Sequence, residues 1–90
     1  MEMRILIADK LSASAVEELE RLGATVTFSP ELAAGDLPGA IGENEVLIVR
    51  STKVTRETVE AAPLLSLIVR AGAGVNTIDI EAASEAGVSV

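Results

Sequence analysis

The sequence contains no histidine, and this absence removes several kinds of active site at once. A chain without histidine cannot supply an imidazole base, a serine-type triad or a histidine metal ligand. It also contains no cysteine, so it forms no disulfide and offers no thiolate to zinc. We therefore assign no catalytic residue and no metal site to this chain.

Aromatic residues are nearly absent too, with one Phe and no Trp or Tyr among 90 residues. The hydrophobic fraction of 49% is still ample for a core, which has to be built from Val, Ile, Leu and Ala. Basic residues number 7 against 14 acidic ones, which gives a net charge of −7. This balance argues against nucleic acid and against anionic membrane surfaces as partners.

The sequence also lacks the apolar runs of targeting and membrane segments. No run approaches the roughly 18 residues that a membrane span requires. Asp9 and Lys10 interrupt the first apolar stretch too early for a signal peptide. Together with the lack of cysteine, this predicts a cytoplasmic protein. The length suits one small domain, so residues 1–90 are expected to form a single domain.

Short apolar runs alternate with amphipathic stretches along the whole chain. The apolar runs predict strands over 4–8, 24–28, 45–49, 67–71 and 88–90. The intervening stretches predict helices that end at Gly23, cover 36–41, run from Thr55 to before Pro63, and cover 80–86. This alternation is typical of an α/β fold. We expect a flavodoxin-like open parallel sheet of five strands in the order 2-1-3-4-5, with helices on both faces.

Two helices carry clear end signals. The first has an inward face composed of Ala15, Val16, Leu19 and Leu22. Its cap is either Ser12 or Ser14, the latter forming a capping box with Glu17. The last helix is predicted to begin at a cap on Asp79 and to end at Gly87.

Ligands of such sheets bind beyond the carboxyl ends of the strands. That edge is predicted to gather four of the seven basic residues, which are Lys10, Arg50, Lys53 and Arg70. An anionic small molecule, either a carboxylate or a phosphate, is therefore the expected ligand. Arg50 with Ser51 and Thr52 offers a forked cation beside two hydroxyls, which suits charge-assisted hydrogen bonds.

The segment 70–79 contains two glycines one residue apart and leads into the last helix. Such a loop either binds an anion through its amides or is simply a tight turn. Gly72, Gly74 and Thr77 do not complete G-x-G-x-x-G, so the loop is not an ordinary dinucleotide fingerprint. Two charged residues of this edge also have structural interpretations: Asp9 as a helix-start or turn residue, and Arg70 as a partner in an ion pair.

Three segments carry a family resemblance. They are Val49-Arg50-Ser51-Thr52-Lys53-Val54-Thr55, then Arg70-Ala71-Gly72-Ala73-Gly74-Val75-Asn76-Thr77-Ile78-Asp79, and finally Ala82-Ala83 with Gly87-Val88-Ser89-Val90. Through them the chain resembles the N-terminal part of the NAD-dependent D-2-hydroxyacid dehydrogenases over essentially its whole length. The second segment indicates the wider family, and the first points to its D-3-phosphoglycerate dehydrogenase branch.

The resemblance implies that residues 1–90 are the first part of a substrate-binding domain. The dinucleotide-binding domain and a C-terminal return segment of that family would lie outside this chain, as would the catalytic groups and the NAD fingerprint. It implies that Arg50 and Ser51 face the phosphate end of the substrate. It also implies that Ala73, Gly74 and Asn76 line the cleft, with Ala73 near the nicotinamide of NAD in the full enzyme.

Three functions are therefore weighed. The first is a substrate-binding half-domain of an oxidoreductase of serine biosynthesis, inactive alone and without a cofactor of its own. The second is a flavodoxin-like structural scaffold that retains no ligand binding. The third, less favoured, is a standalone anion-binding regulator. An edge left exposed by a short terminal strand further predicts self-association.

Overall fold

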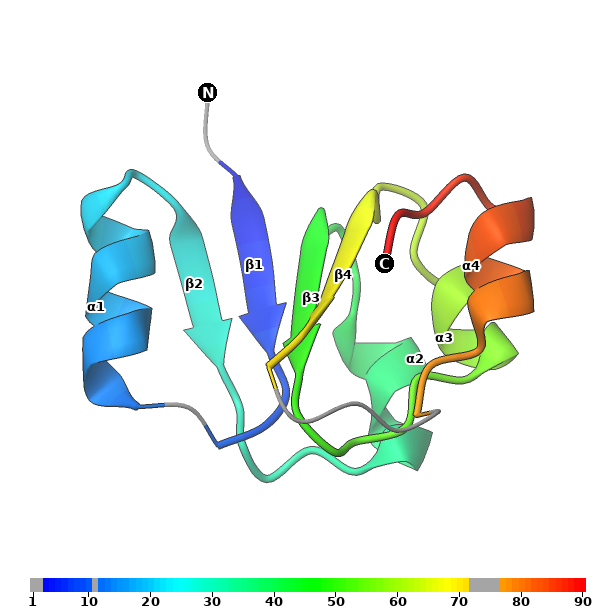
Figure 1. Ribbon diagram of the computed structural model, residues 1–90, viewed down its shortest axis with the longest axis horizontal. Helices are drawn as coiled ribbons and strands as arrows, with labels where there is room; N and C mark the ends of the chain where they lie inside the picture. Colours follow the sequence, from blue (N-terminus) through cyan, green and yellow to red (C-terminus); the bar gives the residue numbers. More distant parts are fainter. Residues whose placement is uncertain (1–2, 11, 72–76) are drawn as a thin grey trace.

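Parallel strands form a sheet at the centre of the molecule, with helices to either side of it (Figure 1). The structure is a computed structural model that describes residues 3–10, 12–71 and 77–90. Its elements, in chain order, are β1 (Arg4–Ile7), α1 (Ala13–Arg21), β2 (Thr25–Phe28), the 3-10 turn η1 (Ala34–Asp36), α2 (Leu37–Ala40), β3 (Val46–Val49), α3 (Arg56–Glu60), β4 (Leu67–Arg70) and α4 (Ile80–Glu85).

The described residues form a four-stranded sheet in the order β2-β1-β3-β4, and every neighbouring pair is parallel. The predicted order of the first four strands is therefore confirmed, and so is the parallel arrangement. The predicted fifth strand over 88–90 is wrong. Ser89 makes only an isolated parallel bridge to Leu67, with Ile68 N donating to Ser89 O at 2.8 Å. One bridge fixes the chain beside β4 but is too short to continue the ladder.

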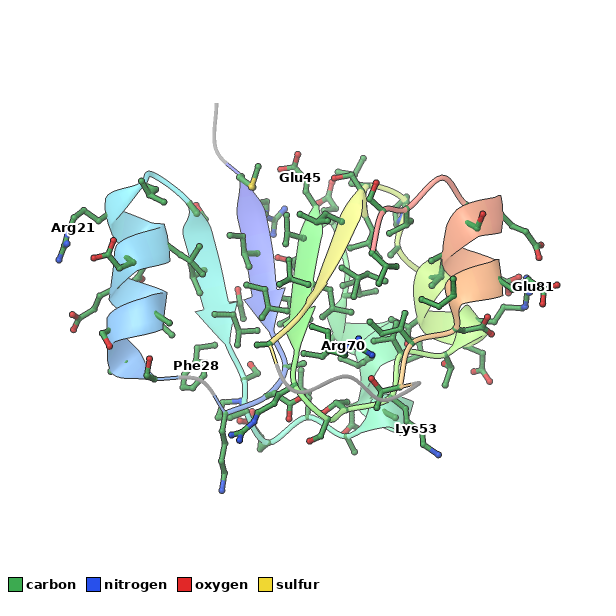
Figure 2. All side chains as sticks on the ribbon, viewed as in Figure 1. Arg21, Phe28, Glu45, Lys53, Arg70 and Glu81 are labelled. Carbon is green, nitrogen blue, oxygen red and sulfur yellow. The ribbon has the colours of Figure 1, made fainter. Side chains whose placement is uncertain are left out.

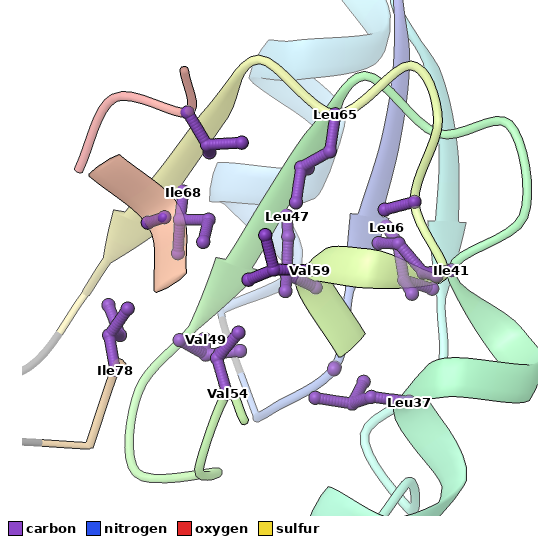
Figure 3. Close-up of a cluster of buried hydrophobic side chains, with 14 of the residues drawn as sticks. Leu6, Leu37, Ile41, Leu47, Val49, Val54, Val59, Leu65, Ile68 and Ile78 are labelled. Atoms are coloured by element: carbon purple, nitrogen blue, oxygen red, sulfur yellow. The ribbon is translucent and has the colours of Figure 1, made fainter. Parts of the chain in front are cut away.

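The sheet is covered on both faces, as predicted, but unequally. Helix α1 packs on one face, and α2, α3 and α4 pack on the other (Figure 1). Because side chains alternate along a strand, Ile5, Ile7, Val46 and Ile48 point toward α1. Their neighbours Leu6, Leu47 and Ile68 point into the larger cluster beneath the three other helices (Figure 3).

The central position of β3 explains its composition. All four of its residues are buried, since it has a strand on either side and is covered above and below. A strand of this kind reads as a continuous apolar run rather than an alternating one. The edge strand β2 alternates Thr with apolar residues instead, and most of it is exposed.

The first helix decides between two predicted caps and corrects one prediction about its inward face. Ser12 is the N-cap, and its Oγ accepts from Ala15 N at 3.3 Å, so the alternative cap on Ser14 is not the one used. Leu22 is 81% exposed rather than inward-facing. The helix has already ended at Arg21, and the chain turns through Gly23, whose φ of +97° is the left-handed conformation expected at a helix end.

The short helix predicted over 36–41 is present as α2, with Asp36 as its N-cap and Ile41 as its C-cap. The 3-10 turn η1 precedes it directly. In the part of the chain that the structure describes, no helix is both long and apolar enough to cross a bilayer.

Candidate functional site

Two loops that are far apart in the sequence lie side by side at the carboxyl ends of the strands. Val54 and Ile78 form an isolated parallel bridge. Val54 N donates to Thr77 O at 2.8 Å, and Asp79 N donates to Val54 O at 2.9 Å. The bridge joins the loop after β3, which carries Arg50 and Ser51, to the segment that leads into α4. The predicted convergence of these two segments is thus present in the fold.

Hydrophobic burial holds this junction in place. Val54 is 1% exposed and Ile78 is 6% exposed, and both belong to the larger core cluster (Figure 3). Val59 of α3 belongs to the same cluster, at the spacing from Val54 that is typical of a hydrophobic staple. Thr55 is the N-cap of α3, although its side chain makes no capping hydrogen bond.

Asp9 follows β1 and binds the loop after β3. Its Oδ2 accepts hydrogen bonds from three successive backbone amides, at 2.6 Å from Arg50 N, 3.0 Å from Ser51 N and 2.9 Å from Thr52 N. The Thr52 hydroxyl adds a second link by donating to Ala8 O at 3.3 Å. The prediction that Asp9 serves its own turn or helix start is therefore wrong. The residue is structural, but it acts on a loop 41 to 43 residues away.

The environment of Asp9 favours its ionised form. Partial burial alone would raise the pKa of the carboxyl, but the backbone amides of Arg50, Thr52 and Ser51 oppose that effect. The net result is a pKa below the ordinary value of 3.8. Hydrogen bonds to the charged form are the cause, since each stabilises the carboxylate relative to the neutral acid.

The side chains that were predicted to meet an anion remain accessible. Arg50 and Ser51 are exposed, whereas Thr52 is partly buried. Arg70 ends β4 and Lys53 lies in the neighbouring loop, and Figure 2 shows both at the end of the molecule where the strands terminate. Lys10 is exposed in the segment after β1. Four basic side chains therefore come from positions at or beyond the carboxyl ends of the strands.

Three predicted site residues cannot be placed. Ala73, Gly74 and Asn76 lie within 72–76, outside the described residues. The predicted position of Ala73 near a nicotinamide therefore also concerns a residue outside the described ranges. The residue that follows, Thr77, is fixed through its bond with Val54. Asp79 caps α4 as predicted, with its Oδ1 accepting from Ala82 N at 2.9 Å.

A salt bridge joins α3 to α4, the two helices that follow the bridged segments. The Arg56 guanidinium donates to both carboxylate oxygens of Glu85, at 3.3 and 3.2 Å. The hydrogen bonds and charge of Glu85 raise the pKa of Arg56. Because both side chains are exposed, this pair adds little to stability.

The opposite end of the sheet carries an apolar pocket of about 300 Å³. It lies at the amino ends of β1 and β2 and is lined by Met3, Ile5, Leu19, Leu22, Gly23 and Ala24. Such a lining offers nothing to orient a charged substrate, so the carboxyl-end edge remains the candidate site. Within residues 3–10, 12–71 and 77–90, no group of three or more acidic side chains could hold a metal ion.

The sequence did not indicate that Asp9 would bind the loop at 50–52. Its position at the end of an apolar run was visible, but its bonding to 50–52 depends on β1 and β3 being neighbours. The predicted strand order places these strands side by side, so the order itself is the signal that could have paired Asp9 with this loop.

Comparison with known proteins identifies a family whose model matches nearly the whole chain. The family model described as "D-isomer specific 2-hydroxyacid dehydrogenase, catalytic domain" matches residues 5–90. The D-3-phosphoglycerate dehydrogenase of Methanocaldococcus jannaschii is 44% identical over 89 residues, which are 98% of this chain and 17% of that protein. D-3-phosphoglycerate dehydrogenase 2, chloroplastic, of Arabidopsis thaliana is 44% identical over 86 residues, which are 93% of this chain and 14% of that protein.

A solved structure shares the fold. The crystal structure of NAD+-bound 3-phosphoglycerate dehydrogenase from Entamoeba histolytica aligns with a TM-score of 0.85 and 32% identity. The alignment covers 98% of this chain and 32% of that one. The chain therefore spans less than a fifth of the length of the two curated relatives and about a third of this structure. By the match over residues 5–90, the chain belongs to the D-isomer-specific 2-hydroxyacid dehydrogenase family.

Proposed function

We propose that this chain forms one wall of the substrate site of a D-3-phosphoglycerate dehydrogenase, as the first part of its substrate-binding domain. The observation that carries the proposal is the bridge between two segments at the carboxyl-end edge. One of these segments carries the exposed side chains of Arg50 and Ser51, and the other leads into α4. The identity of 44% to two D-3-phosphoglycerate dehydrogenases supports the choice of branch.

In this role Arg50 and Ser51 bind the phosphate end of 3-phospho-D-glycerate. A guanidinium presents a planar fork of donors that matches phosphate oxygens, and a neighbouring hydroxyl adds a further donor. Ala73, Gly74 and Asn76 are proposed to line the same cleft from the other loop.

NAD would accept the hydride in the complete enzyme, which we place in serine biosynthesis in the cytoplasm. The isolated chain is proposed to be inactive, since it contains no histidine to act as the base. No step of the hydride transfer is assigned to the described residues.

Two measurements test the proposal. A hydride-transfer assay of the isolated chain with 3-phosphoglycerate and NAD should show no turnover above the blank, and measurable turnover contradicts the assignment of inactivity. Titration with 3-phosphoglycerate, followed by the amide chemical shifts of Arg50, Ser51 and Gly74, should give localised and saturable changes.

A second function is kept because the chain is proposed to supply only one wall of the substrate site. A flavodoxin-like scaffold without ligand binding would leave those shifts unchanged at every phosphoglycerate concentration. A standalone anion-binding regulator would respond equally to phosphoglycerate and to inorganic phosphate, so the two ligands are titrated in parallel.

A further inference from the structure

Three backbone N–H groups in a row converge on one oxygen of Asp9, at 2.6, 3.0 and 2.9 Å. Successive amides that point inward form a concavity of the kind that binds anions in many proteins. Here the anion comes from the chain itself, from the residue that follows the neighbouring strand β1. The loop that bears Arg50 and Ser51 is therefore closed around an internal carboxylate.

We propose that Asp9 is a positioning residue, which fixes the backbone of 50–52 so that the side chains of Arg50 and Ser51 are held toward the substrate anion. The inference rests on the function proposed above and concerns a residue that does not itself touch the substrate. It further assigns the recognition of the anion to the two side chains, because the three amides already have a partner.

Burial and charge are consistent with this division of roles. Asp9 is partly buried, whereas Arg50 and Ser51 are exposed, so the carboxylate lies beneath the loop and the two side chains lie outside it. The Thr52 hydroxyl ties the same loop to Ala8 O, and Ala8 N in turn donates to Ile48 O at 3.0 Å. The loop is thereby anchored to β1 and β3, the two central strands of the sheet.

The first arm of the test needs no ligand. Hydrogen exchange is measured at the amides of Arg50, Ser51 and Thr52 in the wild type and in Asp9→Ala and Asp9→Asn. We expect exchange at all three to accelerate in Asp9→Ala by roughly tenfold or more, as for the loss of a charge-assisted hydrogen bond. Asp9→Asn should accelerate less, because it keeps an acceptor oxygen without the charge.

Asp36→Asn is the matched control. Asp36 also accepts a backbone hydrogen bond, from Ala33 N at 3.0 Å within its own turn. Its replacement should affect exchange at Ala33 and leave 50–52 unchanged. Equal acceleration at 50–52 in Asp36→Asn and Asp9→Ala would mean that a general loss of stability, and not the missing carboxylate, opens the loop.

Chemical rescue separates loop holding from overall folding. Sodium formate supplies a free carboxylate that can enter the concavity vacated in Asp9→Ala, and it should slow exchange at all three amides again. Sodium chloride at the same ionic strength should not. If formate has no more effect than chloride, the three amides do not form a carboxylate site and the proposal is overturned.

The second arm titrates 3-phosphoglycerate into the wild type and Asp9→Ala. Binding by Asp9→Ala should be weaker by roughly tenfold. Equal or tighter binding would overturn the positioning role while leaving the proposed function intact. If the wild type does not bind, the proposed function fails for the isolated chain, and the exchange and formate results decide by themselves whether Asp9 holds this loop.

Discussion

Val54 and Ile78 form a parallel bridge that ties the loop after β3 to the segment before α4, and both side chains are buried in one cluster (Figure 3). The bridge is the means by which two segments more than twenty residues apart come to share one edge. Two backbone hydrogen bonds form the bridge, and the packing of the two apolar side chains holds it in place.

The first prediction concerns this packing. Ile78→Ala should lower the free energy of unfolding by about 2–5 kcal/mol, and Ile78→Val by about 0.5–1.5 kcal/mol, since each leaves a cavity in proportion to the atoms removed. Urea unfolding followed by circular dichroism measures both. Equal costs for the two variants would show that Ile78 does not pack as the structure describes.

A second prediction separates two open glycine positions by their backbone conformation. Gly87 has φ of +75°, whereas Gly39 lies in α2, and an added Cβ would meet nothing within 4 Å at either position. Gly87→Ala should therefore destabilise the chain by roughly 1–2 kcal/mol through backbone strain alone. Gly39→Ala should stabilise it by about 0.5–1 kcal/mol through helix propensity. Stability changes of the same sign would contradict this account.

The third prediction concerns a buried hydroxyl. Thr58 in α3 is fully buried, and within the described residues its Oγ1 has no hydrogen-bond partner. Thr58→Val replaces that hydroxyl with a methyl group of similar shape and should stabilise the chain by about 1 kcal/mol. Thr27→Val, at an exposed position on β2, is the control and should change stability by less than about 0.5 kcal/mol. Destabilisation by Thr58→Val would indicate that the hydroxyl has a partner.

The fourth prediction follows from the lowered pKa of Asp9. A carboxyl whose pKa is lower in the folded than in the unfolded state adds stability above its unfolded value, and this stability is lost as the pH falls through the folded value. Wild-type stability should therefore include a contribution from Asp9 at neutral pH that disappears as the pH falls below 3.8.

Asp9→Asn removes the titrating group and provides the comparison. The variant should be less stable than the wild type at neutral pH, and the difference between them should shrink on acidification. Urea unfolding of both proteins across this pH range measures the difference. A constant difference at every pH would mean that the charge of Asp9 contributes nothing to stability.

The first four strands could be predicted because each depends on local composition, and their order followed from the topology that alternating strands and helices favour. β3 is a run of four apolar residues, and the match between such runs and buried parallel strands is direct. The caps at Asp79 and Gly87 were equally readable, since a cap depends on a residue type within one turn of the helix. The apolar run of a strand and the cap of a helix can each be recognised from residues that are close together in the chain.

The errors arose where distant residues decide the outcome. The partners of Asp9 lie 41 to 43 residues away, and only the assembled sheet brings them together. The apolar spacing of Leu22 fits the helix face, but the helix ends one residue before it. Residues 88–90 have the composition of a strand, yet their pairing with β4 is limited to Ser89.

The last prediction concerns self-association. Leu67 and Val69 of β4 are 37% and 38% exposed, although they lie on the same sheet face as the buried residues Val46 and Ile48. Helix α1 packs over the other part of this face, toward β1 and β2 (Figure 1). The two apolar side chains of the edge strand β4 are therefore left accessible. Exposed apolar edges favour pairing between chains. We therefore expect the apparent mass in sedimentation velocity to rise with protein concentration.

A lysine on this strand should prevent the association, because charged side chains on an edge strand disfavour pairing with another chain. Val69→Lys should remain monomeric at concentrations where the wild type associates. Thr27→Lys adds the same charge to the opposite edge strand β2 and should behave as the wild type does. If the wild type is monomeric throughout, the exposed face of β4 does not drive association. If Val69→Lys and Thr27→Lys are both monomeric where the wild type associates, the added charge itself prevents association and β4 is not the contact.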